Sequence, residues 1–231
     1  MTRNTDQNSA PGTSLCLTLP DDWFLVDPTD PERSRAQITT MLDARVGDAP
    51  WLAEARQVLS DELHAQVRQA AQVDAWLYAF GSLTMFDPPI VVSLVAARFP
   101  GTVDGPGLED LMSTVEDRHP DVRLDLAEAG FGPVLRALRS TQVAEIPMTV
   151  AEYWTDPADK KASARSRATL AMLRFTTPTA TFDVPLLDFF DAIASTLRPG
   201  PATGWQVSEP YPLPQPTWDD NAPDEPREDT P

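Results

Sequence analysis

The sequence contains a single cysteine, Cys16, and no apolar run long enough to cross a membrane. A single cysteine excludes an intramolecular disulfide, so we expect a protein of a reducing compartment. Residues 1–13 lack the apolar core of a secretory signal peptide, and no such core precedes Cys16 as it does in a lipoprotein. Together these absences predict a cytoplasmic protein.

Basic residues are also scarce. The chain has 18 Lys and Arg residues against 35 Asp and Glu residues, which gives a formal net charge of −17. A surface with this excess of carboxylates repels the phosphates of nucleic acids and of anionic membranes. We therefore expect no nucleic-acid partner and no membrane insertion.

Motifs for catalysis and for metal binding are missing as well. The two histidines, His64 and His119, have no second His or Cys at the spacing of metal ligands. The chain has no Gly-x-Ser-x-Gly elbow, and the glycines of residues 100–107 lack the Lys-Ser/Thr of a phosphate-binding loop. The sequence therefore predicts no catalytic residue, no metal site and no cofactor.

The length of 231 residues is sufficient for one domain with a sizeable core. Polar composition without periodicity predicts a disordered N-terminal lead at residues 1–13. The many prolines and acidic residues near the C-terminus predict an acidic, Pro-rich disordered tail at residues 201–231. A single domain at residues 14–200 is expected between them.

The sequence of the first part of this domain predicts a β-hairpin followed by two helices. Leu15, Leu17 and Leu19 alternate with smaller residues, and residues 23–26 return after a turn, as in a hairpin. Asp30 as N-cap and Pro31 at the first helical position predict a helix to about Val46. A second helix over residues 50–71 carries an apolar stripe that is expected to face inward: Leu52, Ala55, Leu59, Leu63, Val67 and Ala70.

The remaining segments predict a sheet with further helices. Strands are expected at residues 75–84 and 90–99, and the nearly continuous apolar run of residues 90–97 predicts the central strand. Trp76, Tyr78 and Phe80 share one parity of the first strand and are expected to pack in the core. After them the pattern predicts a short helix, four strands and a closing helix capped by Asp183, at residues 108–119, 122–126, 134–140, 143–154, 168–176 and 183–197.

This order of elements predicts an α+β fold: a largely antiparallel sheet with packed helices, arranged as an α/β/α sandwich. Two segments carry a resemblance, Leu19-Pro20-Asp21-Asp22-Trp23 near the start and Phe175-Thr176-Thr177-Pro178 before the closing helix. Over residues 14–199 the chain resembles a group of uncharacterised actinobacterial proteins and, more widely, the Mog1/PsbP-like sandwich. The resemblance implies mostly non-catalytic binding or assembly factors, by fold-level analogy alone, and it transfers no functional residue.

The basic residues that do occur are concentrated in one polar segment. Both lysines of the chain, Lys160 and Lys161, lie there with Arg165 and Arg167. In a strongly acidic molecule such a reversal of charge predicts a contact site for an acidic partner, although a solvated connection is the alternative. In the tail, the predicted contact residues are the aromatic ones, Trp205, Tyr211 and Trp218.

These patterns favour a non-catalytic protein-binding module, an adaptor or assembly factor with a protein partner. Two alternatives stay open. One is a small-ligand-binding protein or an enzyme with a pocket between sheet and helices, near Trp76, Tyr78 and His119; the other is a structural subunit of a larger assembly. A core filled by side chains favours the binding module or the subunit, whereas an open pocket favours the ligand-binding protein.

Overall fold

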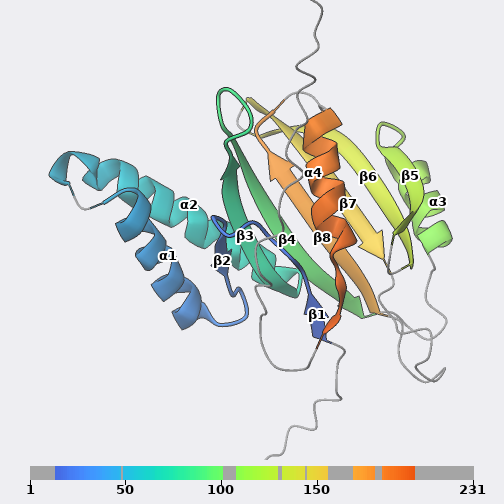
Figure 1. Cartoon of the computed structure of the whole chain (residues 1–231), viewed down its shortest axis with the longest axis horizontal. Helices are drawn as coiled ribbons and strands as arrows, with labels where there is room; N and C mark the ends of the chain where they lie inside the picture. The colour runs from blue at the N-terminus through green and yellow to red at the C-terminus, as the bar shows by residue number, and fades with distance from the viewer. Residues whose placement is uncertain are drawn as a thin grey trace, which may run out of the picture.

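The computed structural model of the chain describes residues 14–47, 49–100, 108–129, 132–143, 145–155, 169–179 and 184–200. In these ranges a seven-stranded antiparallel sheet in the order β2-β3-β4-β8-β7-β6-β5 carries four packed helices (Figure 1). The predicted α+β sandwich is therefore confirmed. The strands are β2 (Phe24–Val26), β3 (Ala75–Leu83), β4 (Ile90–Pro100), β5 (Arg123–Ala129), β6 (Gly132–Val143), β7 (Ile146–Thr155) and β8 (Thr169–Thr177). The helices are α1 (Pro31–Arg45), α2 (Ala53–Gln72), α3 (Leu108–Arg118) and α4 (Val184–Ser195).

Helices cover both faces of the sheet. On the α4 face, Phe175 of β8 stacks on Phe190 of α4 with ring centroids 4.5 Å apart. On the opposite face, which we call the hairpin face, Leu63 and Val67 of α2 pack in one buried cluster with Met172 of β8. Successive side chains of a strand point to opposite faces, and β2, β3, β4, β7 and β8 contribute to both cores.

The strand predicted to be central, β4, is interior, but the middle strand of the sheet is β8. β8 pairs with β4 through Leu94 and Phe175 and with β7 through Ala151 and Phe175. A continuous apolar run shows that a strand is covered on both faces and has two neighbours. It does not give the position of that strand in the sheet, because this position depends on where later strands pair.

The predicted N-terminal hairpin is wrong. β1 (Ser14–Cys16) pairs with β9 (Arg198–Gly200) in a separate two-stranded sheet, whereas β2 pairs with β3. Leu15, Leu17 and Leu19 belong to the core under α4, and Val26 belongs to the core under α1 and α2. Residues 23–26 serve both cores, because Trp23 and Leu25 pack with Leu15 under α4. The hairpin is absent because each segment finds its backbone partner in a strand far away in the sequence.

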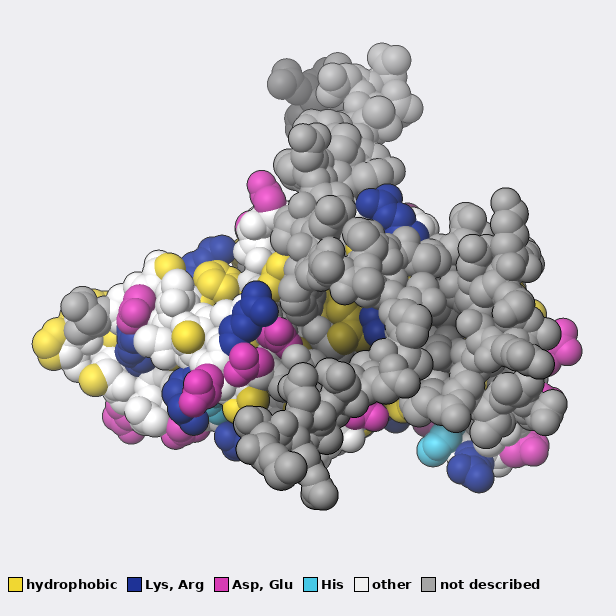
Figure 2. All heavy atoms as spheres, turned by 90° about the horizontal axis from the view of Figure 1, so that it is seen from below, with side chains coloured by type: hydrophobic (Ala, Val, Ile, Leu, Met, Phe, Trp, Pro, Cys, Tyr) yellow, Lys and Arg dark blue, Asp and Glu magenta, His cyan; other side chains and the backbone are white. Residues whose placement is uncertain are grey.

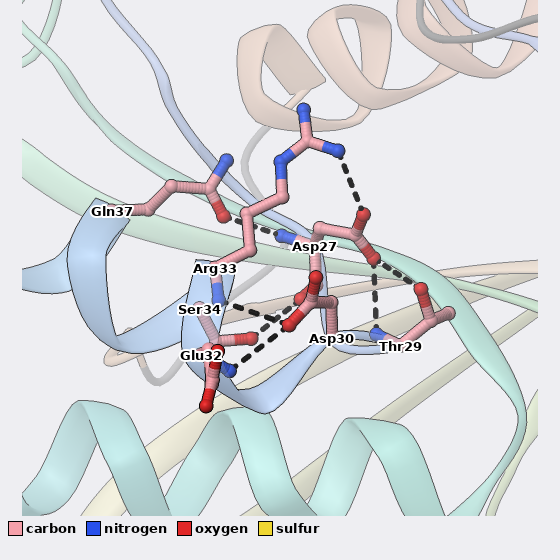
Figure 3. A network of polar contacts seen from close by, with 7 residues as sticks. All are labelled: Asp27, Thr29, Asp30, Glu32, Arg33, Ser34 and Gln37. Atoms are coloured by element: carbon pink, nitrogen blue, oxygen red, sulfur yellow. Dashed lines mark hydrogen bonds and ion pairs between the residues drawn. The ribbon is translucent and has the colours of Figure 1, made fainter.

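The start of α1 is confirmed. The carboxylate of Asp30 accepts hydrogen bonds from the backbone N–H groups of Glu32 and Arg33, at 3.0 and 3.1 Å (Figure 3). The nearby Asp27 carboxylate accepts from the hydroxyl and the N–H of Thr29 and pairs with Arg33. This network satisfies N–H groups that an α-helix leaves without a partner, so it fixes where the helix begins.

The closing helix has the predicted buried stripe: Leu186, Phe190, Ile193 and Leu197 are each at most 6% exposed. Its predicted cap, Asp183, lies outside the described residues.

Pro147 lies at an edge position of the sheet. It precedes Thr149, the first β7 residue paired with β8, so Pro147 has a neighbour only in β6, as is typical of proline in a strand. No helix in the described ranges is long and apolar enough to span a membrane.

Candidate functional site

The predicted contact residues lie outside the described part of the chain. This applies to the basic group Lys160, Lys161, Arg165 and Arg167, and to the tail residues Trp205, Tyr211 and Trp218. The hypothesis of an acidic partner at the basic segment therefore stays a prediction.

The residues named for the alternative pocket do not converge. The register of β3 and β4 shifts between Ala75 and Leu77, so Trp76 packs against the core under α4, whereas Tyr78 is buried under α2. His119 follows α3, which packs against β6, four strands away from β3 in the sheet. A β-bulge changes the parity of the residues on either side of it, and no pattern of side chains in β3 indicated this bulge. The described residues also contain no group of His, Cys, Asp or Glu side chains that could hold a metal ion.

One cluster of charged side chains ties α4 to the sheet. Arg136 of β6 donates to Asp191 of α4 at 2.6 Å and to Asp125 of β5 at 3.1 Å. The hydroxyl of Tyr153 donates to the other oxygen of Asp191 at 2.6 Å. Burial raises the pKa of the Tyr153 phenol, and the Asp191 carboxylate raises it further. These bonds join α4 to β5, β6 and β7, so the cluster acts as a structural clamp between the helix and the sheet.

A different surface is formed where the pair α1 and α2 projects beyond the sheet at β2 (Figure 1). We define the hairpin tip as Trp51, Ala55, Val58 and Leu59. Trp51 is 82% exposed, Val58 64% and Leu59 39%. Hydrophobic side chains gather at the projecting end of the molecule (Figure 2). The tip thus places three large apolar side chains in water at one end of the molecule, and such a concentration is typical of an interaction site.

The prediction that the whole apolar stripe of α2 faces inward is wrong for its first half. Leu63 and Val67 are 5% exposed, as expected, but Ala55 and Leu59 of the same stripe are exposed. The apolar face of α2 is longer than the sheet that it packs on. The first half of the stripe therefore extends past the edge strand and has no core to enter.

Local structure holds the tip in place. Gly47 has a φ of +77° in the turn after α1, and Pro50 begins the short 3-10 helix Pro50–Leu52 that precedes α2. Arg56 donates to the carbonyl of Gly47 at 2.7 Å and forms an ion pair with Asp43 of α1. The two helices are thus joined near the tip by a charge-assisted contact, which presents Trp51 on an ordered element.

Carboxylates accompany the apolar side chains of the tip along α2. Glu54, Asp61 and Glu62 are exposed on the same two turns of α2. Gln57 donates to Asp61 at 3.0 Å and leaves its charge uncompensated. The tip therefore combines an aromatic and aliphatic centre with a negative border.

In comparisons with known proteins, no protein-family model and no curated protein matches the chain. The resemblance to the Mog1/PsbP-like sandwich stays a prediction.

The sequence does hold a signal for the tip that the single-stripe interpretation missed. In the helix predicted over residues 50–71, Trp51 and Val58 are seven residues apart and fall on one face, which lies beside the stripe of Leu52 and Leu59. A second apolar face on an amphipathic helix indicates more contacts than one core can supply.

Proposed function

We propose that this protein is a non-catalytic protein-binding module, an adaptor or assembly factor whose primary contact is the hairpin tip. The observation that carries the proposal is Trp51, exposed to 82% at the end of a projecting helical pair. Tryptophan is among the residues that contribute most to binding free energy at protein interfaces. An ordered tryptophan that no core covers is therefore suited to enter an apolar pocket of a partner.

The border of the tip supports a particular class of partner. With Glu54, Asp61 and Glu62 around the apolar centre, a partner with Lys or Arg around its pocket gains favourable charge contacts and faster association. A second copy of this chain would place like charges against each other. We therefore expect a heterologous partner with a basic rim.

Site-specific crosslinking tests the proposal. A photo-crosslinking amino acid at position 51 in the full chain, expressed in its native cell, should capture one discrete protein. The matched control is position 184, because Val184 on α4 is 69% exposed and lies away from the tip. Capture from position 184 with equal yield, or no capture from position 51, would contradict the proposal.

The captured protein can then be purified and titrated against variants. Trp51→Ala should weaken binding about 30-fold or more, the effect of losing an interface hot spot of about 2 kcal/mol. Val184→Ala should bind like the unmodified chain. Exchange of Glu54 and Asp61 for Lys should slow association, and it should reduce the dependence of the association rate on salt.

A further inference from the structure

A second surface lies on the hairpin face, beyond the part that α2 covers. We define the open sheet surface by its exposed apolar residues Val91, Val143 and Ile146, and by the adjacent charged residues Arg139, Glu152 and Arg174. Val91 is 54% exposed, Val143 58% and Ile146 52%. The strands β4, β8, β7 and β6 are neighbours there, and alternation along each strand places these side chains on one face.

The charged residues of this surface are not balanced. Glu152 accepts from Arg174 Nε at 2.7 Å and from an Arg139 terminal nitrogen at 3.3 Å, through the same oxygen. One carboxylate thus serves two guanidinium groups, and one positive charge stays uncompensated. The arginine side chains are 39% and 40% exposed, and the buried Nε of Arg139 has no hydrogen-bond partner in the described part of the chain. A carboxylate ligand would supply acceptors, in the geometry that guanidinium groups prefer.

We propose that the open sheet surface binds an acidic, proline-rich segment, and that its occupant is residues 211–220 of this same chain. That segment places Tyr211, Leu213 and Trp218 directly before Asp219 and Asp220. The apolar side chains match the row of Val91, Val143 and Ile146, and the two carboxylates match Arg139 and Arg174.

Three features of the sequence make this occupant suitable. Prolines at positions 210, 212, 214 and 216 favour a preformed extended conformation, which reduces the entropy lost on binding. From Gly200, where β9 ends, a chain of 19 residues reaches Asp219 and spans up to about 60 Å when extended. Seven strands span only about 30 Å. Covalent attachment also supplies a high effective concentration, which permits occupancy by a weak contact.

The charge of the molecule makes other occupants unfavourable. A nucleic acid would meet the same local arginines, but as a separate polyanion it would have to approach a chain of formal charge −17. The segment 211–220 is already attached, and its carboxylates are part of that charge. The inference concerns a surface different from the hairpin tip, so it stands or falls independently of the proposed function.

Paramagnetic relaxation in the full chain tests the inference. A nitroxide is attached at Asp224→Cys after exchange of the buried Cys16 for Ala, and amide signals are recorded at low and moderate salt. We expect selective broadening at residues 139–150 and 174–176, and less of it at higher salt, because exposed charges are screened beyond about 8 Å at physiological ionic strength.

Two variants and one control define the outcome. Arg139→Gln with Arg174→Gln should abolish the broadening. Asp219→Asn with Asp220→Asn should do the same without altering the sheet, so the test holds even if the arginine variant fails to fold. Arg68→Gln with Arg118→Gln removes the same charge from two exposed helix positions and should leave the broadening intact.

Four outcomes would overturn the inference. These are broadening that is absent or uniform in the starting chain, broadening that survives the Asp219 and Asp220 exchange, broadening lost on exchange of Lys160 and Lys161 for Gln, and broadening in a mixture of nitroxide-labelled and isotope-labelled chains. The third outcome would place the segment at the basic loop, and the fourth would show contact between two copies.

Discussion

At the scale of single residues, Tyr78 and Tyr153 make the free energy of unfolding depend on pH. Both side chains are at most 4% exposed, and the Tyr78 hydroxyl donates to Gln66 of α2. Burial raises the pKa of the Tyr78 phenol, and the Glu62 carboxylate raises it further. Burial likewise raises the pKa of Tyr153. The folded state therefore holds both phenols protonated at a pH where an unfolded chain releases their protons.

The consequence for stability has a definite sign. An unfolded tyrosine has a pKa of about 10, so the stabilisation is complete below about pH 10 and decreases as pH rises above it, by up to about 1.4 kcal/mol per pH unit for each tyrosine. Denaturant unfolding between pH 8 and pH 11 measures this decrease. Tyr78→Phe with Tyr153→Phe should flatten it, at a cost at pH 8 of about 1 kcal/mol for the neutral bond to Gln66 and about 2 kcal/mol for the bond to the Asp191 carboxylate. An unchanged alkaline slope in that variant would refute the assignment.

Substitution of Leu94 tests whether β4 is buried in the core. It is fully buried, at 0% exposed, between β3 and β8. Leu94→Asp should place a carboxylate without a partner in this core and cost several kcal/mol or prevent folding. Val91→Asp on the same strand is the control, because Val91 is 54% exposed and should tolerate the change. A Leu94→Asp protein with an unchanged melting temperature would contradict the burial of β4.

At the scale of elements, the Asp30 cap determines the start of α1. Asp30→Ala removes the acceptor for two backbone N–H groups and should lower the free energy of unfolding by about 1 kcal/mol. Asp22→Ala is a suitable control: Asp22 is exposed in a turn, and only its backbone carbonyl accepts a bond, from Arg45. Equal midpoints for the two variants in denaturant would show that the cap contributes nothing.

Helix α2 shows how one element serves two purposes. Its second half buries Leu63, Val67 and Ala70, and its first half presents the hairpin tip. The physical reason is length: twenty residues at 1.5 Å each give a helix of about 30 Å, and the part that passes the edge strand meets no sheet. Stability and binding are therefore separable within α2.

At the scale of the whole molecule, the ends of the chain contribute unequally to stability. Truncation after Ser208 should leave the denaturant midpoint nearly unchanged, because a proline-rich acidic segment has little apolar surface to offset an ordering cost of about 1–2 kcal/mol per residue. Truncation after Leu197 removes β9 and leaves β1 without its partner, so it should destabilise the protein measurably. A loss above about 2 kcal/mol for the first truncation would show that the tail is part of the fold.

Local sequence determined much of this protein. Asp30 and Pro31 specified the start of α1, the apolar run of residues 90–97 specified an interior strand, and the stripe from Leu186 to Leu197 specified the closing helix. Each of these features depends on neighbours within a few residues, through capping, alternation or helical periodicity. The α+β class followed from their order along the chain.

Only the tertiary structure decided which segments meet. The pairing of β1 with β9, the shift that turns Trp76 to the α4 face, and the exposure of Leu59 depend on partners far away in the sequence. The same holds for Arg139, Glu152 and Arg174, which lie on three strands and become one cluster through strand register. Local patterns carry no information about register between distant strands or about where a sheet ends, because both depend on the free energy of the whole packed molecule.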